Sequence, residues 1–352
     1  MTALGDILIQ RIRATGPITL ADYMNECLLH PEHGYYTTRD PLGAAGDFTT
    51  APEMSQMFGE LIGLALAQAW MDQGAPETFA LAELGPGRGT LMADILRATR
   101  AVAGFHAAAQ VHLVEASPTL RAAQAKLVPG ATWHASIETL PDLPLLMVAN
   151  EFFDALPIRQ FHRYANGWQE TVIGVQDTTL TAGLTPPAPL ASLDHRLDDT
   201  KSGDIVEVCP ALTAITGEIG ARIALHGGAA LIIDYGDWQS QGDTLQALQN
   251  HETVDPFAAP GMADLTVHVD FAALAGAAAP AAFTRVTPQG VFLERLGITQ
   301  RAQALAQNLD GAALENHIAA HHRLTHPDAM GHLFKVIGLY PKGATPPPGL
   351  TP

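Results

Sequence analysis

Apolar side chains first recur at helical spacing and then gather into short continuous runs. Residues 53–71 place apolar side chains three and four positions apart, which predicts an amphipathic helix that starts after Pro52. The next apolar run, residues 79–84, ends abruptly at Gly-Pro-Gly. Such a run is typical of a buried parallel strand, and a second helix is predicted over residues 90–102.

This alternation of strand and helix continues along the chain and predicts a parallel sheet with helical crossovers. A further buried strand is expected at residues 229–234, but residues 151–228 are too long for a single crossover. An inserted subdomain is therefore expected there, with a hairpin around Asn166-Gly167. The remaining predicted elements are strands at 111–115, 131–135, 145–150, 283–287 and 332–340, and helices at 119–127, 211–225 and 293–309.

These elements divide the chain into five predicted parts. They are a helical N-terminal extension, the first half of the sheet, the inserted subdomain, the remainder of the sheet, and a Pro- and Gly-rich tail expected to be disordered. In the same order, they cover residues 1–75, 76–150, 151–228, 229–342 and 343–352.

Composition and charge exclude several classes of protein. Apolar residues make up 47% of the chain and charged residues 16%, as in a folded globular protein. The 36 acidic side chains outnumber the 19 basic ones, and the net charge of −17 repels nucleic acid and anionic membranes. This charge would attract a basic substrate, although solubility alone also explains it. The most apolar helical stretch, residues 61–71, is too short to span a bilayer.

The cellular location is predicted from two further features. Cys27 and Cys209 are far apart in sequence, which indicates neither a disulfide framework nor a zinc site. The first twenty residues resemble neither a signal peptide nor a transit peptide. We therefore expect a cytoplasmic protein.

The turn after the strand at 79–84 carries the clearest chemical signal. Glycines are needed where the chain turns sharply and where the backbone approaches a ligand, and the following helix aims its free amides into the same space. A glycine-rich packing turn is the alternative, but the required order of strand, turn and helix is met. The predicted cofactor-binding residues in this turn are Glu83, Gly85, Pro86, Gly87 and Gly89.

Acidic residues indicate which cofactor this turn binds. Glu115 ends the next strand, where a carboxylate accepts hydrogen bonds from both ribose hydroxyls, and Ser136 is a further candidate contact. Glu83 would attract the amino group and sulfonium of S-adenosylmethionine, whereas it would repel the pyrophosphate of a dinucleotide. S-adenosylmethionine is therefore the predicted cofactor, and a nicotinamide oxidoreductase is the alternative.

The segment after the strand at 145–150 contains the candidate catalytic residues Asn150, Glu151 and Asp154. Ligands bind beyond the carboxyl ends of parallel strands. A nitrogen that attacks a methyl group must be held in line and must lose a proton, and carboxylates pair well with guanidinium groups. Alternatively, Asp154 only begins a helix and Glu151 is a solvated charge.

Weaker signals concern the substrate and metals. Residues 46–55, around Asp47, are interpreted either as a lid or as a structural loop before a helix. Asp264 and His268 follow the fifth strand and are candidate substrate contacts. His317 and His321 lie one helical turn apart, but no HExxH pattern accompanies them, so no metal site is predicted.

Several segments together resemble the MidA family of S-adenosylmethionine-dependent methyltransferases, whose mitochondrial members act in the assembly of respiratory complex I. They span nearly the whole chain in family order. Two departures are mild: Ala51 stands where many family members have Ser, and Val267 stands where Ala is common. The resembling segments are GDFTTAPEMSQMFGELIG, ELGPGRGTLMADIL, VEASP, ANEFFDALPIRQF, IIDYG, APGMADLTVHVDF, QGVFLERLGI and MGHLFKVIGLYP.

The resemblance implies a Rossmann-like α/β fold of class I methyltransferases. Its sheet is expected to have seven strands, mostly parallel with the last antiparallel, and an inserted subdomain. The implied activity is methylation of arginine in a protein partner, and the implied partner is a complex I subunit. A non-catalytic assembly factor that binds S-adenosylmethionine and a small-molecule methyltransferase remain alternatives, and no oligomeric state is predicted.

Overall fold

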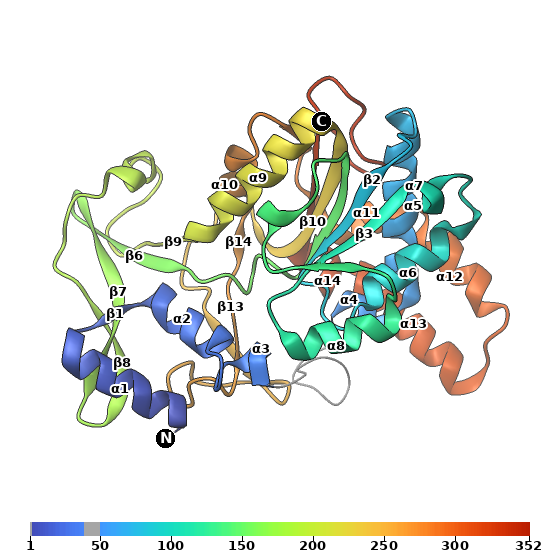
Figure 1. Cartoon of the computed structure of the whole chain (residues 1–352). Coiled ribbons are helices and arrows are strands. Elements are labelled where there is room, and N and C mark those ends of the chain that lie inside the picture. Colours follow the sequence, from blue (N-terminus) through green and yellow to red (C-terminus); the bar gives the residue numbers. More distant parts are fainter. Residues whose placement is uncertain (1, 39–49) are drawn as a thin grey trace. The chain divides into compact units, whose positions relative to one another are not determined.

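The computed structural model describes residues 2–38 and 50–352, and the chain forms two compact units (Figure 1). We call Thr49–Phe153, Thr213–Trp238 and Phe271–Pro352 the sheet unit, and Met1–Phe48, Asp154–Leu212 and Gln239–Asp270 the insert unit. The N-terminal extension predicted over residues 1–75 is divided between the two units, because its second half packs on the main sheet.

The main sheet of the sheet unit has the strand order of a class I methyltransferase, which confirms the predicted fold. Among the described residues, its strands follow the order β15-β17-β10-β5-β2-β3-β4. Neighbouring strands from β10 to β4 are parallel, whereas β17 runs antiparallel to β10 and β15. The strands are β2 (Phe79–Leu84), β3 (Ala109–Val114), β4 (Thr132–His134), β5 (Leu145–Asn150), β10 (Gly228–Asp237), β15 (Ala282–Phe283), β16 (Thr287–Pro288) and β17 (Phe334–Tyr340).

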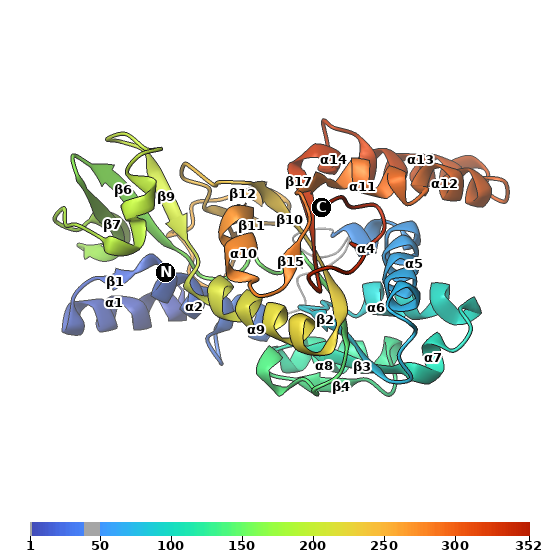
Figure 2. The same cartoon turned by 90° about the horizontal axis from the view of Figure 1, so that it is seen from above.

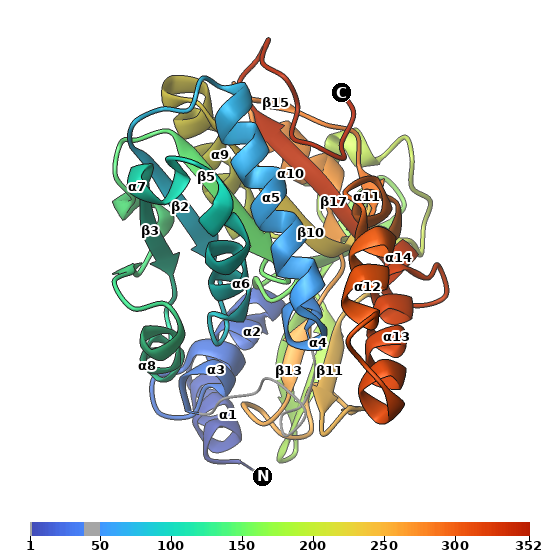
Figure 3. The same ribbon diagram turned by 90° about the vertical axis from the view of Figure 1, so that its right-hand side faces the viewer.

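Helices cover both faces of this sheet (Figures 2 and 3). Apolar residues of α5, α6 and α11 form one continuous core with β2, β5, β10 and β17. On the other side, α9 approaches the end of α10 so closely that a Cβ on Gly220 would lie 2.0 Å from the Ala278 carbonyl oxygen. The helices are α4 (Ala51–Met54), α5 (Gln56–Asp72), α6 (Thr90–Ala98), α7 (Phe105–Ala108), α8 (Pro118–Leu127), α9 (Pro210–His226), α10 (Phe271–Ala277), α11 (Gln289–Arg295), α12 (Ile298–Ala306), α13 (Gly311–Thr325) and α14 (Met330–Leu333).

Two predicted helices are each broken into two. The helix predicted over 53–71 becomes α4 and α5, because Ser55 is extended and its side chain caps α5 at the amide of Met57. The helix predicted over 293–309 becomes α11 and α12, separated by Gly297 in the left-handed region (φ 91°). The strand predicted over 283–287 is reduced to the two-residue strands β15 and β16.

The C-terminal tail is packed, so the disorder predicted for residues 343–352 is wrong. Leu350 is 7% exposed and lies in the core of the sheet unit, and the Thr351 carbonyl accepts a hydrogen bond from the Arg285 amide at 2.9 Å. Gly338 of β17 provides the space, because a Cβ there would lie 2.8 Å from Leu350 Cδ1. Proline and glycine prevent regular structure in this tail but not burial.

The insert unit contains two small sheets against N-terminal helices. One sheet follows the order β1-β7-β6-β9 with β8 beside β7, and the other follows β12-β11-β13. The predicted hairpin is β6 and β7. The elements are α1 (Ala3–Thr15), β1 (Ile18–Thr19), α2 (Leu20–Leu29), α3 (Tyr35–Thr38), β6 (Arg159–Tyr164), β7 (Gly167–Gln176), β8 (Thr179–Leu184), β9 (Ile205–Val208), β11 (Gln246–Gln249), β12 (Glu252–Thr253), β13 (Asp264–Thr266) and β14 (Val269–Asp270).

The core of the insert unit joins segments that are distant in sequence. Leu4, Tyr23 and Ile173 are buried together with Leu265 in one apolar cluster. The α2 helix begins with a capping box, in which Thr19 and Asp22 satisfy each other's backbone amides. No helix in residues 2–38 and 50–352 combines the length and apolar character needed to cross a membrane.

Candidate functional site

The predicted cofactor turn is a strand-to-helix connection in which three glycines adopt positive φ. Gly85, Gly87 and Gly89 have φ values of 60°, 54° and 89°. A Cβ on Gly85 would lie 2.8 Å from the Phe152 ring, and Gly89 is the N-cap of α6. These glycines therefore permit both the sharp turn and its close packing.

Glu83 ends up buried beside this turn with an oxygen that lacks a protein partner. Its side chain is 2% exposed, and its Oε2 has no hydrogen-bond partner among the residues that the structure describes. Burial raises the pKa of Glu83 to about 8, and the negative charge of Glu115 adds to this, whereas a hydrogen bond from the Met92 amide opposes it. A buried carboxyl with a free oxygen suits a cationic ligand group.

Glu115 is held at the end of β3 by hydrogen bonds to both carboxylate oxygens. Its Oε1 accepts from the Ser117 amide at 2.8 Å, and its Oε2 accepts from Gln124 Nε2 at 3.1 Å. Burial raises the pKa of Glu115, and these hydrogen bonds oppose that shift. Ser136 lies in the loop after β4, partly exposed, where its hydrogen bond lowers the pKa of Glu138.

Gln124 is a residue of this region that the sequence reasoning missed. It is fully buried, and its Nε2 also donates to the Gly87 carbonyl at 2.7 Å, while its Oε1 accepts from Trp133 Nε1 at 2.8 Å. Gln124 thus links the glycine turn to the Glu115 carboxylate. The sequence feature that could have identified Gln124 is its position four residues after Leu120, on the buried stripe of α8.

The segment after β5 has an unusual backbone that is held by several hydrogen bonds. Glu151 has φ 51°, a left-handed conformation that is costly for a residue other than glycine. Asn150 Nδ2 donates to Glu151 Oε1 at 3.0 Å, and Asn150 Oδ1 is buried without a hydrogen-bond partner among the described residues. This strained conformation at the carboxyl end of a parallel strand indicates a functional role.

Asp234 supports the same segment and was also missed as a site residue. It is fully buried at the carboxyl end of the apolar part of β10, and its Oδ2 accepts from the amides of Phe152 and Phe153 at 3.2 and 3.0 Å. The sequence feature that could have identified Asp234 is an acidic residue at the end of a buried apolar strand.

In the insert unit, Asp154 and Asp264 lie near the phenol of Tyr36. The Tyr36 hydroxyl donates to Asp264 Oδ1 at 2.8 Å, and the Asp154 carbonyl accepts from the Val267 amide at 3.0 Å. Burial raises the pKa of Tyr36, and the negative charges of Asp264 and Asp154 raise it further. The structure therefore brings two predicted site residues together around a tyrosine that was not predicted.

Of the other two predicted substrate residues, the structure describes His268 but not Asp47. The His268 amide donates to Thr244 Oγ1 at 2.9 Å, so its backbone is fixed within the insert unit. Asp47 lies outside the described residues, as do positions 46, 48 and 49 of the predicted lid at 46–55, whereas residues 51–54 of that segment form α4.

The histidines of α13 have structural contacts. His317 Nε2 lies 2.9 Å from the Ala302 carbonyl, and His321 Nε2 lies 3.1 Å from Thr299 Oγ1. Among the described residues, no group of three or more His, Cys, Asp or Glu side chains is arranged to hold a metal ion.

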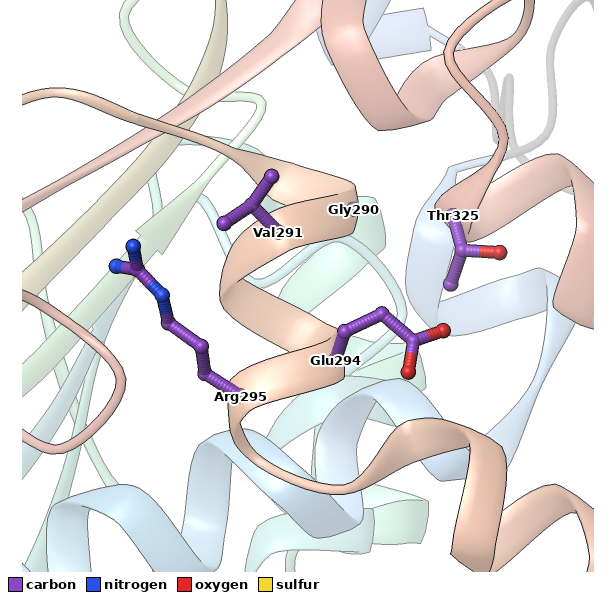
Figure 4. Close-up of a pocket in the computed structure, with 5 residues that line it drawn as sticks. All are labelled: Gly290, Val291, Glu294, Arg295 and Thr325. Atoms are coloured by element: carbon purple, nitrogen blue, oxygen red, sulfur yellow. The ribbon is translucent and has the colours of Figure 1, made fainter.

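A surface hollow of about 450 Å³ lies beside α11 and the end of α13 (Figure 4). Its two charged lining residues are already engaged, since Arg295 Nη1 donates to the Gly349 carbonyl at 3.0 Å and Glu294 Oε1 accepts from Thr299 at 2.7 Å. The side chains of Glu294 and Arg295 point apart. None of the predicted site residues lines this hollow.

Comparison with known proteins identifies relatives over nearly the whole chain. Residues 61–288 match a family of S-adenosyl-L-methionine-dependent methyltransferases. The human protein named "Protein arginine methyltransferase NDUFAF7, mitochondrial" is 37% identical over 95% of this chain and 82% of its own length. The zebrafish (Danio rerio) protein of the same name is 36% identical over 94% of this chain and 85% of its own.

A solved structure agrees with these relatives. A protein from Burkholderia thailandensis bound to S-adenosyl-homocysteine superposes with a TM-score of 0.84 and 29% identity, over 99% of this chain and 94% of the other. This similarity, together with the family match, shows that S-adenosylmethionine is the cofactor of this chain.

The comparisons correct the prediction of a cytoplasmic location. The human and zebrafish relatives are named as mitochondrial proteins, which contradicts that prediction. The expectation rested on two cysteines and on the composition of the first residues, and neither feature specifies a compartment.

The sheet order, the glycine turn between Glu83 and α6, and the similarity over nearly the whole chain agree with one another. The chain therefore belongs to the MidA family of S-adenosylmethionine-dependent methyltransferases.

Proposed function

We propose that this enzyme methylates arginine side chains of a protein partner. The observation that carries the proposal is the 37% identity, over 95% of the chain, to a human protein named as a protein arginine methyltransferase. The buried and partly buried carboxylates after β5 and at Tyr36 support it, because acidic groups recognise guanidinium by charge and by paired hydrogen bonds. We further propose a subunit of respiratory complex I as the partner, on the family resemblance.

The described residues fit the cofactor. Glu83 Oε2 and Asn150 Oδ1 are buried acceptors without a protein partner, as expected of atoms that hydrogen-bond a ligand. In the proposed arrangement Glu83 pairs with the amino group, Gly85 to Gly89 form the turn around the ligand, Glu115 accepts from the ribose hydroxyls, and Ser136 and Asn150 add polar contacts. When bound, S-adenosylmethionine supplies a methyl group on a positively charged sulfur.

The proposed chemical role belongs to Glu151. Its carboxylate accepts a hydrogen bond from the guanidinium and turns one nitrogen toward the methyl group. That nitrogen would take the methyl group as the methyl–sulfur bond breaks with its electron pair left on sulfur, and a carboxylate oxygen of Glu151 would accept the proton that the nitrogen loses. The left-handed backbone of Glu151 and its hydrogen bond to Asn150 support this role, because they limit the orientations of the carboxylate. Asp154 and Asp264 are proposed to bind the positively charged substrate.

The test is transfer of a tritiated methyl group from the cofactor to protein extracts, with mass spectrometry of the labelled residue. Label in methylarginine, strongly reduced in Glu151→Gln and kept in the surface control Glu77→Gln, supports the proposal. Label confined to low-mass material would identify a small-molecule methyltransferase instead. Full cofactor binding without any transfer would favour a non-catalytic assembly factor.

A further inference from the structure

Helix α4 contacts both the cofactor turn and the Glu151 carboxylate. Two residues in one turn of this helix make these contacts: Ala51 through its backbone amide and Glu53 through its side chain. The Ala51 amide donates to Glu151 Oε1 at 3.2 Å. Glu53 Oε1 accepts from Thr90 Oγ1 at 2.5 Å, and Glu53 Oε2 lies 3.7 Å from Arg88 Nη1.

The two partners of Glu53 lie in the cofactor turn and directly after it. Arg88 lies within the glycine sequence, and Thr90 is the first residue of α6, directly after the N-cap Gly89. The Glu53 side chain is 17% exposed, so water competes only partly for these contacts. Glu53 therefore fixes α4 to the start of the helix whose Met92 amide binds Glu83.

The remaining contacts make α4 a rigid connection. Ala51 is fully buried, and Met54 packs on the core of the sheet unit. The Ala51 amide and Asn150 Nδ2 both donate to Glu151 Oε1, so the orientation of this carboxylate depends on where α4 lies. A displacement of α4 would remove one of these two donors.

We propose that Glu53 is a positioning residue, which holds α4 between the cofactor turn and Glu151 and thereby sets the orientation of the Glu151 carboxylate. Glu53 itself takes no part in proton transfer. The catalytic consequence rests on the proposed function of Glu151, whereas the physical link between Glu53 and the Ala51 amide does not.

The first experiment measures hydrogen exchange of the Ala51 amide in the full chain. Glu53→Ala is expected to speed this exchange by about tenfold or more, because α4 loses its contact with the turn. Glu53→Gln keeps an acceptor for Thr90 and is expected to stay close to wild type. The matched control Glu77→Ala removes an exposed carboxylate of the same unit. Unchanged Ala51 exchange in Glu53→Ala would overturn the proposal.

The second experiment is a double-mutant cycle on methyl transfer. Glu53→Ala is expected to lower kcat by about tenfold while the Kd for S-adenosylhomocysteine changes less than about threefold. In the Glu151→Gln background the same change should cost nothing further, since its target is already removed. Losses that multiply would overturn the positioning role. Full kcat in Glu151→Gln alone would refute the proposed function, and Ala51 exchange would still decide the link to Glu53.

Discussion

Cofactor binding should depend on pH through one buried carboxyl. The pKa of Glu83 is raised to about 8, so at neutral pH most molecules without ligand carry a proton on this group. A cationic amino group prefers the ionised form, and binding must therefore release a proton. At pH 7 about 0.9 proton should be released, and the Kd should weaken about 25-fold between pH 7.5 and pH 6.

Calorimetry with S-adenosylhomocysteine measures both quantities, since titrations in buffers of different ionisation enthalpy count the released protons. Glu83→Gln should bind more weakly but should lose this pH dependence. The comparison with Glu83→Gln also removes the titration of the ligand's own amino group, whose pKa is usually about 8. A Kd that is constant between pH 6 and pH 7.5, or the same slope in the variant, would refute the reasoning.

The raised pKa of Glu83 has the opposite effect on the stability of the protein without ligand, which should fall as the pH rises. The folded-state pKa of about 8 exceeds the ordinary value of 4.5, so the folded protein retains a proton that the unfolded chain releases. This contribution is fully present below pH 4.5 and is lost as the pH rises toward 8, by at most about 1.4 kcal/mol per pH unit. Denaturant titrations of wild type and Glu83→Gln should therefore diverge over this range.

Three further substitutions test the site. Gln124→Ala should lower the free energy of unfolding by about 1–3 kcal/mol and weaken cofactor binding in calorimetry, because buried partners lose a donor; unchanged binding would contradict its linking role. Gly85→Ala should destabilise by about 1 kcal/mol or more in thermal unfolding, through its positive φ and the contact with Phe152. Tyr36→Phe removes the hydrogen bond from the Tyr36 hydroxyl to Asp264 Oδ1 and should change the KM for protein substrate but not the cofactor Kd; a kinetic profile equal to wild type would contradict this.

Local sequence predicted the central strands well. The bounds of β2 and β5 agree with the predicted runs, because both strands are buried on both faces and end where the chain must turn. The split between α4 and α5 was missed, since apolar spacing continues through Ser55 while the backbone there is extended. Periodicity records which side chains are buried and does not detect a single extended residue.

The candidate site could be predicted only where its chemistry is local. Glu83 and the glycines lie in one short segment, so their pattern is visible in the sequence. Gln124, Asp234 and Tyr36 become recognisable only once the chain is folded, because each has a partner far away in sequence, at 37, 82 and 228 positions. The identity of a polar residue gives little indication of such distant contacts.

The packing of Leu350 against Gly338 limits which truncations and fusions the carboxyl end of this enzyme tolerates. Deleting the last ten residues would leave a hole over β17 and expose apolar side chains of the sheet unit. An affinity tag or fluorescent fusion at the carboxyl end would need a flexible spacer so that Leu350 stays in place. Since Thr2 caps α1 and also donates to the Pro260 carbonyl, a label at the amino end needs the same care.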